Sequence, residues 1–105
     1  MLLKKEYIIT KLKELKPIFK KEDINLLGLF GSYSNGKEQS NSDIDILIET
    51  TPAFLNKYRG FKAHLKLDEL KELLQKTFNK KIDFTDKQGL IQNNNLYILD
   101  RTIYV

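Results

Sequence analysis

The chain has 105 residues, no cysteine, and a formal net charge of +4 from 18 basic and 14 acidic side chains. This length accommodates a single domain, residues 1–105, with a modest core, and the lack of cysteine excludes disulfides and thiolate chemistry. The lack of cysteine also fits a reducing compartment, so we expect a cytoplasmic protein. No apolar run reaches the roughly 20 residues of a spanning helix, so no membrane contact is expected.

The positive charge favours anionic partners such as nucleotides. The lysines are spread along helix-like segments instead of forming one tract, so solvated helix faces are favoured over a nucleic-acid surface. Direct binding of nucleic acid is therefore not expected.

The first predicted element is an amphipathic helix over residues 3–20, where apolar side chains recur at helical spacing between lysines and glutamates. Pro17 lacks a backbone N–H, so we expect this helix to kink, or to end near Leu15 and resume as a short turn. The run from Ile24 to Phe30 is short and almost wholly apolar. Such a run is typical of a central strand that is covered on both faces.

The segment from Gly31 to Ser42 is predicted to be a functional loop, too polar to pack and held between two strands. A residue without a Cβ, such as Gly31, lets the backbone approach a ligand, and the hydroxyl of Ser32 can donate to a phosphate oxygen. Tyr33 could stack on a ligand or simply shield the loop.

The second predicted strand opens with Asp43 and Asp45 and ends at a break from Thr50 to Pro52. Because side chains alternate along a strand, both carboxylates face one solvated side, while the isoleucines between and after them face the core. Glu49 shares the aspartate face and is expected to be solvated.

Residues 54–78 are predicted to form one or two helices, with the clearest apolar stripe from Leu65 to Phe78. His64, the only histidine, is expected to be a surface or packing residue there. After a turn, the alternating stretch from Ile82 to Thr85 predicts a third strand, on which Asp83 faces away from the core. Residues 88–95 fit a loop or a ragged helix. Residues 96–105 could dock as helix or strand.

The spacing of Gly31-Ser32, ten further residues, and Asp43-Ile44-Asp45 resembles the signature of the nucleotidyltransferase superfamily that includes DNA polymerase beta and the kanamycin nucleotidyltransferases. The short chain is similar to its minimal nucleotidyltransferase branch, typified by MntA antitoxins that are paired with HEPN-domain toxins. The resemblance covers residues 26–84. It implies an α+β fold, with a small mixed β-sheet and helices packed on one face.

The resemblance also implies a set of metal ligands. Nucleotidyl transfer requires a neutralised triphosphate and an acceptor hydroxyl in line with the α-phosphorus, and two magnesium ions about 3.5 to 4 Å apart provide both. Magnesium prefers oxygen ligands. By resemblance, Asp43 and Asp45 would bridge the two ions. A third catalytic carboxylate near the acceptor would be Asp83, with Asp86 as its nearest rival.

For the nucleotide, the resemblance implies that Gly31 and Ser32 hold the β- and γ-phosphates of ATP. The family often reads Gly-Ser-x-Ala-Arg-Gly, whereas Asn35 stands here in place of the arginine. Lys37 lies close enough in sequence to supply the missing cation.

The implied function is magnesium-dependent transfer of AMP from ATP to a tyrosine of a cognate HEPN toxin, with this chain as the antitoxin. A lone catalytic domain must find its acceptor on a partner surface, and the shortness of the chain fits that requirement. Two alternatives remain open: a non-catalytic, nucleotide-binding antitoxin that occludes its partner, which Asn35 favours, and a stand-alone transferase that acts on a small molecule.

Overall fold

The computed structural model describes residues 3–37, 39 and 42–105. These residues form a mixed sheet of four strands in the order β3-β2-β1-β4. The strands are β1 (Ile24–Phe30), β2 (Ile44–Thr50), β3 (Ile82–Asp86) and β4 (Ile103–Tyr104). β1 pairs antiparallel with both β2 and β4, whereas β2 pairs parallel with β3.

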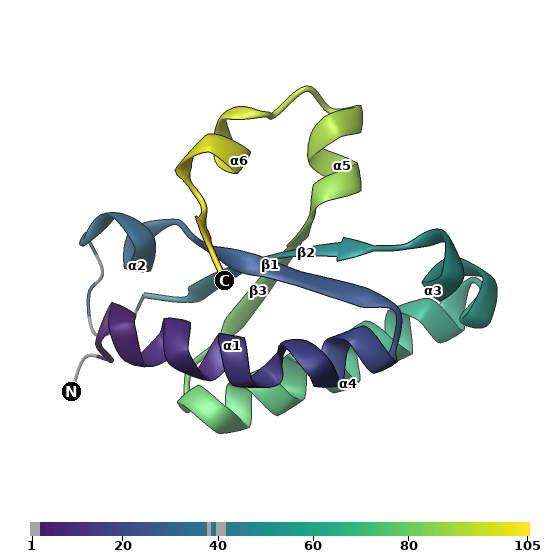
Figure 1. Cartoon of the computed structure of the whole chain (residues 1–105), viewed down its shortest axis with the longest axis horizontal. Coiled ribbons are helices and arrows are strands. Elements are labelled where there is room, and N and C mark those ends of the chain that lie inside the picture. The colour runs from purple at the N-terminus through teal and green to yellow at the C-terminus, as the bar shows by residue number, and fades with distance from the viewer. Residues whose placement is uncertain (1–2, 38, 40–41) are drawn as a thin grey trace.

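Two long helices, α1 (Lys5–Lys21) and α4 (Phe61–Phe78), lie along one face of the sheet (Figure 1). The short helices are α2 (Ser32–Asn35), α3 (Pro52–Lys57), α5 (Lys87–Gln92) and α6 (Tyr97–Arg101). In Figure 1, α5 and α6 stand on the side of the sheet opposite α1 and α4. The expected α+β fold with a small mixed sheet is confirmed. None of the helices in the described part of the chain is both long and apolar enough to cross a bilayer.

The core lies between the sheet and the two long helices. Ile44, Ile46 and Ile48 of β2 are at most 1% exposed and face this core. Leu47 is also fully buried, although alternation places it on the aspartate face. Because α5 packs against β2 on that side, the aspartate face is partly covered instead of being wholly solvated.

α1 is continuous through Pro17, so the expected break near Leu15 is wrong. A proline inside a helix costs one backbone hydrogen bond and about 3 kcal/mol. Here the turn that follows Pro17 is held by Phe19, which is fully buried and meets the ring of Phe84 edge-on at 6.1 Å between centroids. Tertiary packing of that last turn offsets the local cost.

Residues 96–105, for which the sequence allowed either helix or strand, contain both the helix α6 and the edge strand β4. β4 pairs with β1 at Gly28 and Leu29. A Cβ on Gly28 would lie 2.2 Å from the carbonyl oxygen of Ile103, so only glycine lets β4 come this close.

The predicted helical region of residues 54–78 is divided into α3 and α4, and Thr51 caps α3 by accepting from the backbone N of Phe54 at 3.3 Å.

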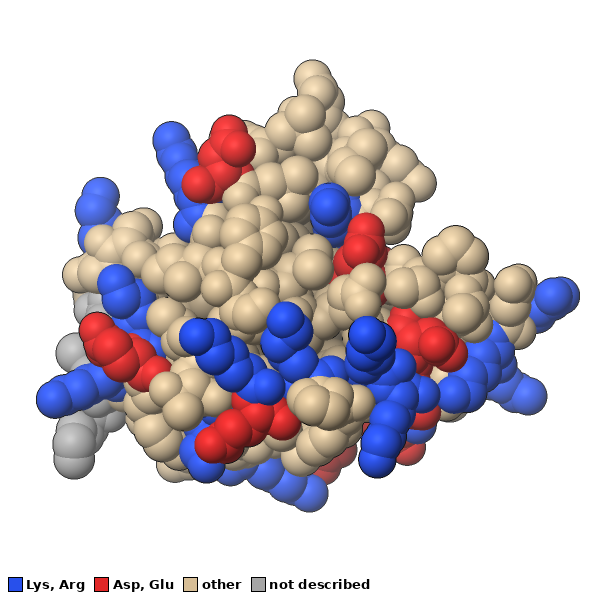
Figure 2. Space-filling model, viewed as in Figure 1, with Lys and Arg blue, Asp and Glu red and all other residues tan. Residues whose placement is uncertain are grey.

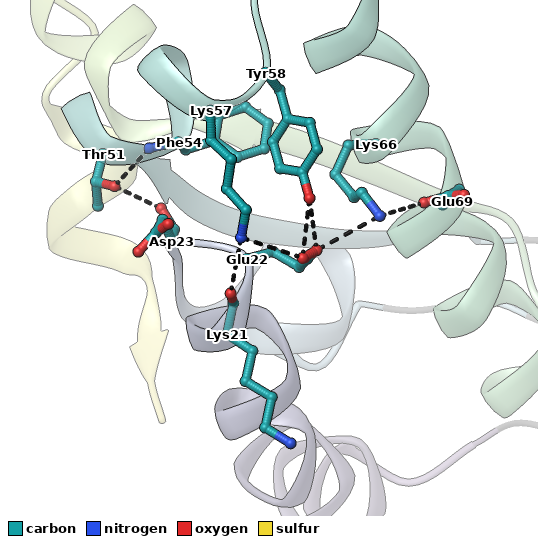
Figure 3. Close-up of polar contacts among 9 residues, drawn as sticks. All are labelled: Lys21, Glu22, Asp23, Thr51, Phe54, Lys57, Tyr58, Lys66 and Glu69. Carbon is teal, nitrogen blue, oxygen red and sulfur yellow. Dashed lines mark hydrogen bonds and ion pairs between the residues drawn. The ribbon is translucent and has the colours of Figure 1, made fainter.

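Glu22, just after α1, ties that helix to α3 and α4 (Figure 3). Its carboxylate oxygens each accept from the Tyr58 hydroxyl at 3.0 Å, and they lie 3.7 and 3.5 Å from the Nζ atoms of Lys57 and Lys66. Burial raises the pKa of Glu22, but the Tyr58 hydroxyl and the two lysines outweigh it, so the pKa lies below its ordinary value.

Glu22→Gln is therefore expected to lower the free energy of unfolding at pH 7 by about 0.5–1.5 kcal/mol. The folded state lowers this pKa, so the stabilisation is present above the ordinary carboxyl pKa and is lost as the pH falls through the folded one. Urea denaturation at pH 7 and pH 3 should show the difference from wild type shrinking at acid pH. Glu14→Gln is the control, because Glu14 lies on the exposed surface, where it pairs with Lys11 at 3.3 Å. An equal effect of both variants would contradict the prediction.

Candidate active site

The three predicted carboxylates lie near one end of the parallel pair formed by the central strand β2 and the edge strand β3. Asp45 of β2 lies in register with Asp83 of β3, and neighbouring strands are about 4.8 Å apart. Asp43 precedes β2 by one residue and shares the face of Asp45 by alternation. The parallel pairing of β2 with β3 thus brings together residues that are 38 positions apart in the sequence.

The pKa of Asp45 is shifted from its ordinary value. Burial, and then the charges of Asp83 and Asp43, raise the pKa of Asp45 to about 6. On the outer side, the Nζ of Lys81 lies 3.9 Å from Oδ2 of Asp43. Burial and the neighbouring negative charges therefore disfavour ionisation of Asp45.

This set of donors fits magnesium chemically, because it consists of carboxylate oxygens whose mutual repulsion a divalent cation would relieve. In the described part of the chain, no three acidic, histidine or cysteine side chains converge closely enough to enclose a metal ion. The strands thus place the carboxylates next to one another, but their side chains are not drawn together around one point.

Gly31 touches the carboxylate of Asp45. Its backbone has φ 76° and ψ −153°, a region open essentially to glycine alone. A Cβ at this position would lie 2.2 Å from Oδ2 of Asp45. Both backbone conformation and space therefore require glycine where the sequence predicted a close approach.

The segment after Gly31 was expected to be a loop, but Ser32–Asn35 forms the short helix α2. Ser34 Oγ donates to the carbonyl oxygen of Gly31 at 2.8 Å. Tyr33 is fully buried in the core, which favours the shielding role over stacking on a ligand. Residues 38, 40 and 41 of the predicted loop lie outside the described residues. Ser32 is half-buried and Lys37 is exposed.

Asp86, the rival of Asp83, has a structural position. Its Oδ1 accepts from the backbone N of Thr50 at 3.3 Å and from that of Gln88 at 3.1 Å, which caps α5. Its Oδ2 accepts from the Thr50 hydroxyl. It lies opposite Ile48, three positions along β3 from Asp83. Its oxygens are thus engaged away from the Asp45–Asp83 pair.

Two further polar residues can now be placed. Glu49 was expected to be solvated, but its carboxylate accepts from Asn25 Nδ2 at 3.1 Å and Gln88 Nε2 at 3.2 Å. Glu49 is only partly buried, so these two contacts with β1 and α5 leave it accessible to solvent. His64 is exposed on α4, with its Nε2 3.4 Å from Oδ2 of Asp68, in agreement with a surface residue.

A cavity of about 450 Å³ lies beside Gly31, between α2 and α6. It is lined by Phe30, Gly31, Ser34, Asn35, Tyr97, Ile98 and Arg101. Sequence reasoning did not identify the three residues from α6. The signal that could have drawn attention to them is an aromatic residue and an arginine four positions apart, Tyr97 and Arg101.

Comparison with known proteins agrees with this geometry. Residues 13–102 match the family described as Polymerase beta, Nucleotidyltransferase. The chain therefore belongs to the polymerase beta-type nucleotidyltransferase family and is a nucleotidyltransferase.

Individual relatives and one solved structure are also similar to the chain. A Methanocaldococcus jannaschii protein that bears the provisional name of protein adenylyltransferase is 34% identical over 86 residues, covering 82% of this chain and 87% of the relative. Protein adenylyltransferase MntA of Thermococcus cleftensis is 30% identical over 93 residues, covering 89% and 83% of the two chains. A solved structure described provisionally as a minimal nucleotidyltransferase superposes with a TM-score of 0.73 at 18% identity, covering 98% of this chain and 97% of that one. That last likeness shows the shared fold.

Proposed function

We propose that this protein transfers AMP from ATP to a hydroxyl group on a protein, in a reaction that depends on magnesium. The observation that carries the proposal is the register of Asp45 with Asp83, with the backbone of Gly31 against the Asp45 carboxylate. The names of the relatives from Thermococcus cleftensis and Methanocaldococcus jannaschii, both protein adenylyltransferases, support the choice of a protein acceptor.

Each residue has a role in this reaction. Gly31 and Ser32 bind the phosphates of ATP, and Asp43, Asp45 and Asp83 would hold two magnesium ions. Bound magnesium would neutralise the triphosphate. The acceptor oxygen forms a bond to the α-phosphorus while the bond to the bridging oxygen breaks, and pyrophosphate leaves with that electron pair. Asp83, on the outer of the two strands, receives the proton of the acceptor hydroxyl.

We further propose that the acceptor is a tyrosine of a cognate HEPN toxin, that residues 1–105 act in the cytoplasm as one domain, and that this chain is the antitoxin. A surface suited to a protein partner borders the cavity. Ile91, Leu96 and Tyr97 of the α5–α6 region are about half exposed, at 49%, 46% and 56%. In Figure 2 this upper region carries few charged side chains, whereas basic and acidic residues alternate over α1 below it. Exposed apolar groups of this kind favour protein contacts over nucleic acid.

Intact mass spectrometry tests this function. With ATP, magnesium and the HEPN partner, the partner should gain one or more AMP groups on tyrosine, and EDTA should abolish the gain. ATP should bind appreciably only with magnesium or manganese, because its phosphates would otherwise face three carboxylates. Asp83→Asn should slow transfer more than it weakens ATP binding, since a proton acceptor acts mainly in the transition state. Equally tight ATP binding in EDTA would contradict the metal-bridged arrangement.

The alternative is an antitoxin that works by occlusion, and Asn35 at the position of the family arginine is the observation that favours it. A tight complex that neutralises the partner without any mass gain, under any nucleotide, would replace the enzymatic proposal with this one. Transfer of AMP to a small hydroxyl compound in the absence of the partner would instead indicate a stand-alone transferase.

A further inference from the structure

We propose that Arg101 of α6 binds the pyrophosphate end of the nucleotide in the cavity beside Gly31, where it stabilises pyrophosphate as the leaving group. This deepens the proposed function and rests on it, in that ATP is taken as the donor.

The sheet order sets a direction across the site. Asp83 on β3 pairs with Asp45 on β2, and Asp45 pairs with Phe30 on β1. Residues directly opposite one another in a sheet point to the same face, so the three side chains form a row. The cavity begins at Phe30 and Gly31, and its far wall is α6, which leads into β4 on the other side of β1. The cavity and Asp83 therefore lie on opposite sides of Asp45.

The geometry of in-line displacement indicates which part of ATP lies in the cavity. The attacking oxygen and the leaving oxygen must lie on opposite sides of the α-phosphorus. If Asp83 receives the proton of the acceptor, the acceptor approaches from the β3 side. The leaving pyrophosphate must then point toward Gly31 and the cavity, so the cavity receives the part of ATP on which negative charge accumulates as the bond breaks.

The cavity has one positively charged lining residue among those described, Arg101. In the described part of the chain Arg101 forms no ion pair, and its guanidinium carbon lies 5.6 Å from the ring centroid of Tyr97. Stacking on an aromatic ring holds the planar guanidinium in place and leaves its N–H groups free to donate. Arg101 and Lys37, the cation suggested by the sequence, are both exposed, but only Arg101 is among the described residues that line the cavity.

The other walls suit this role. Phe30 and Ile98 are apolar, so they lower the local dielectric constant and strengthen an arginine–phosphate pair. Ser34 and Asn35 add polar groups on the α2 side. An arginine can bind two phosphate oxygens at once, a geometry that lysine cannot reproduce.

Isothermal titration calorimetry with two probes, magnesium pyrophosphate and AMP, tests the assignment on the full chain. Arg101→Ala should weaken pyrophosphate binding about 10- to 100-fold, the cost of a lost charged hydrogen-bond pair, and leave AMP binding within about twofold. Arg101→Lys should recover part of the loss. Arg59→Ala is the matched control, because Arg59 carries the same charge on the exposed surface and does not line the cavity, and it should change neither affinity.

Other outcomes would overturn the proposal. An equal loss of AMP affinity would mean that the cavity holds the nucleoside, and unchanged affinity for both probes would mean that Arg101 has no part in binding. Thermal melting of each variant separates these results from unfolding. If no acceptor is ever modified and yet pyrophosphate binding still depends on Arg101, the proposed function fails and the anion site stands. If transfer is observed and Arg101→Ala leaves its kcat unchanged, this inference fails and the proposed function stands.

Discussion

Asp45→Asn is expected to abolish nucleotidyl transfer while leaving the protein without ligands as stable as wild type at pH 7, or more stable. The variant keeps the shape of the side chain but removes a negative charge from between Asp43 and Asp83. Burial, and then the charges of Asp83 and Asp43, raise the pKa of Asp45 to about 6, so ionisation at neutral pH costs the folded state free energy. The gain in the variant should be about 1–2 kcal/mol after allowance for solvent screening.

The pH dependence identifies the cause of that gain. Because the folded state raises this pKa from 3.8 to about 6, it binds more protons than the unfolded chain between these values. The stability of the wild type should therefore fall as the pH rises from about 4 to about 7, and Asp45→Asn should flatten that fall. Denaturation curves at several pH values, measured without metal, provide the test.

A core variant of the same strand supplies the contrast for Asp45→Asn. Ile46 is fully buried, so Ile46→Ala should cost about 2–5 kcal/mol. If Asp45→Asn destabilised the protein to a similar degree, Asp45 would be a structural residue and its assignment to the active site would be wrong.

Gly31→Ala is expected to have the second large effect, lowering both stability and transfer. The backbone conformation of Gly31 should cost any other residue about 1–3 kcal/mol. The added Cβ would also displace the Asp45 carboxylate, which lies 2.2 Å from its position. A shift of about 1 Å at a reacting centre can cost about 10²-fold in rate, so kcat/KM should fall by at least that factor.

Gly36→Ala is the matched control, because Gly36 also has a positive φ, 78°, but nothing lies within 4 Å of its Cβ position. It should show only the modest cost of the left-handed conformation. Urea denaturation and the rate of AMP transfer should thus separate the two variants. Part of any difference in stability reflects the backbone, because Gly31 has ψ −153° and Gly36 has ψ 13°. Equal losses in the rate of AMP transfer would contradict a role for the contact between position 31 and Asp45.

Much of the fold could be predicted locally. β1 and β3 were expected from Ile24 to Phe30 and from Ile82 to Thr85, and the structure has them at Ile24–Phe30 and Ile82–Asp86. Short apolar or alternating runs with turn residues on both sides identify strands well. The break expected at Pro17 did not occur, and α2 was missed, because buried aromatic side chains hold both turns and such burial is not visible in a local pattern.

The candidate site, too, was predictable from the sequence only in part. The sequence by itself determined the chemical groups: the glycine and serine after β1, the paired aspartates of β2, and the alternation that puts Asp43 and Asp45 on one face. Local spacing was sufficient because these groups lie on one strand–turn–strand unit.

Only the tertiary structure decided which later residues join them. The parallel register of β2 with β3 put Asp83 beside Asp45 and left Asp86 to cap α5. The return of the chain along β1 as β4 brought α6, and with it Arg101, to the cavity beside Gly31. The register of β2 with β3 and the position of α6 depend on contacts between residues far apart in the sequence. The periodicity of side chains along the chain does not predict such contacts.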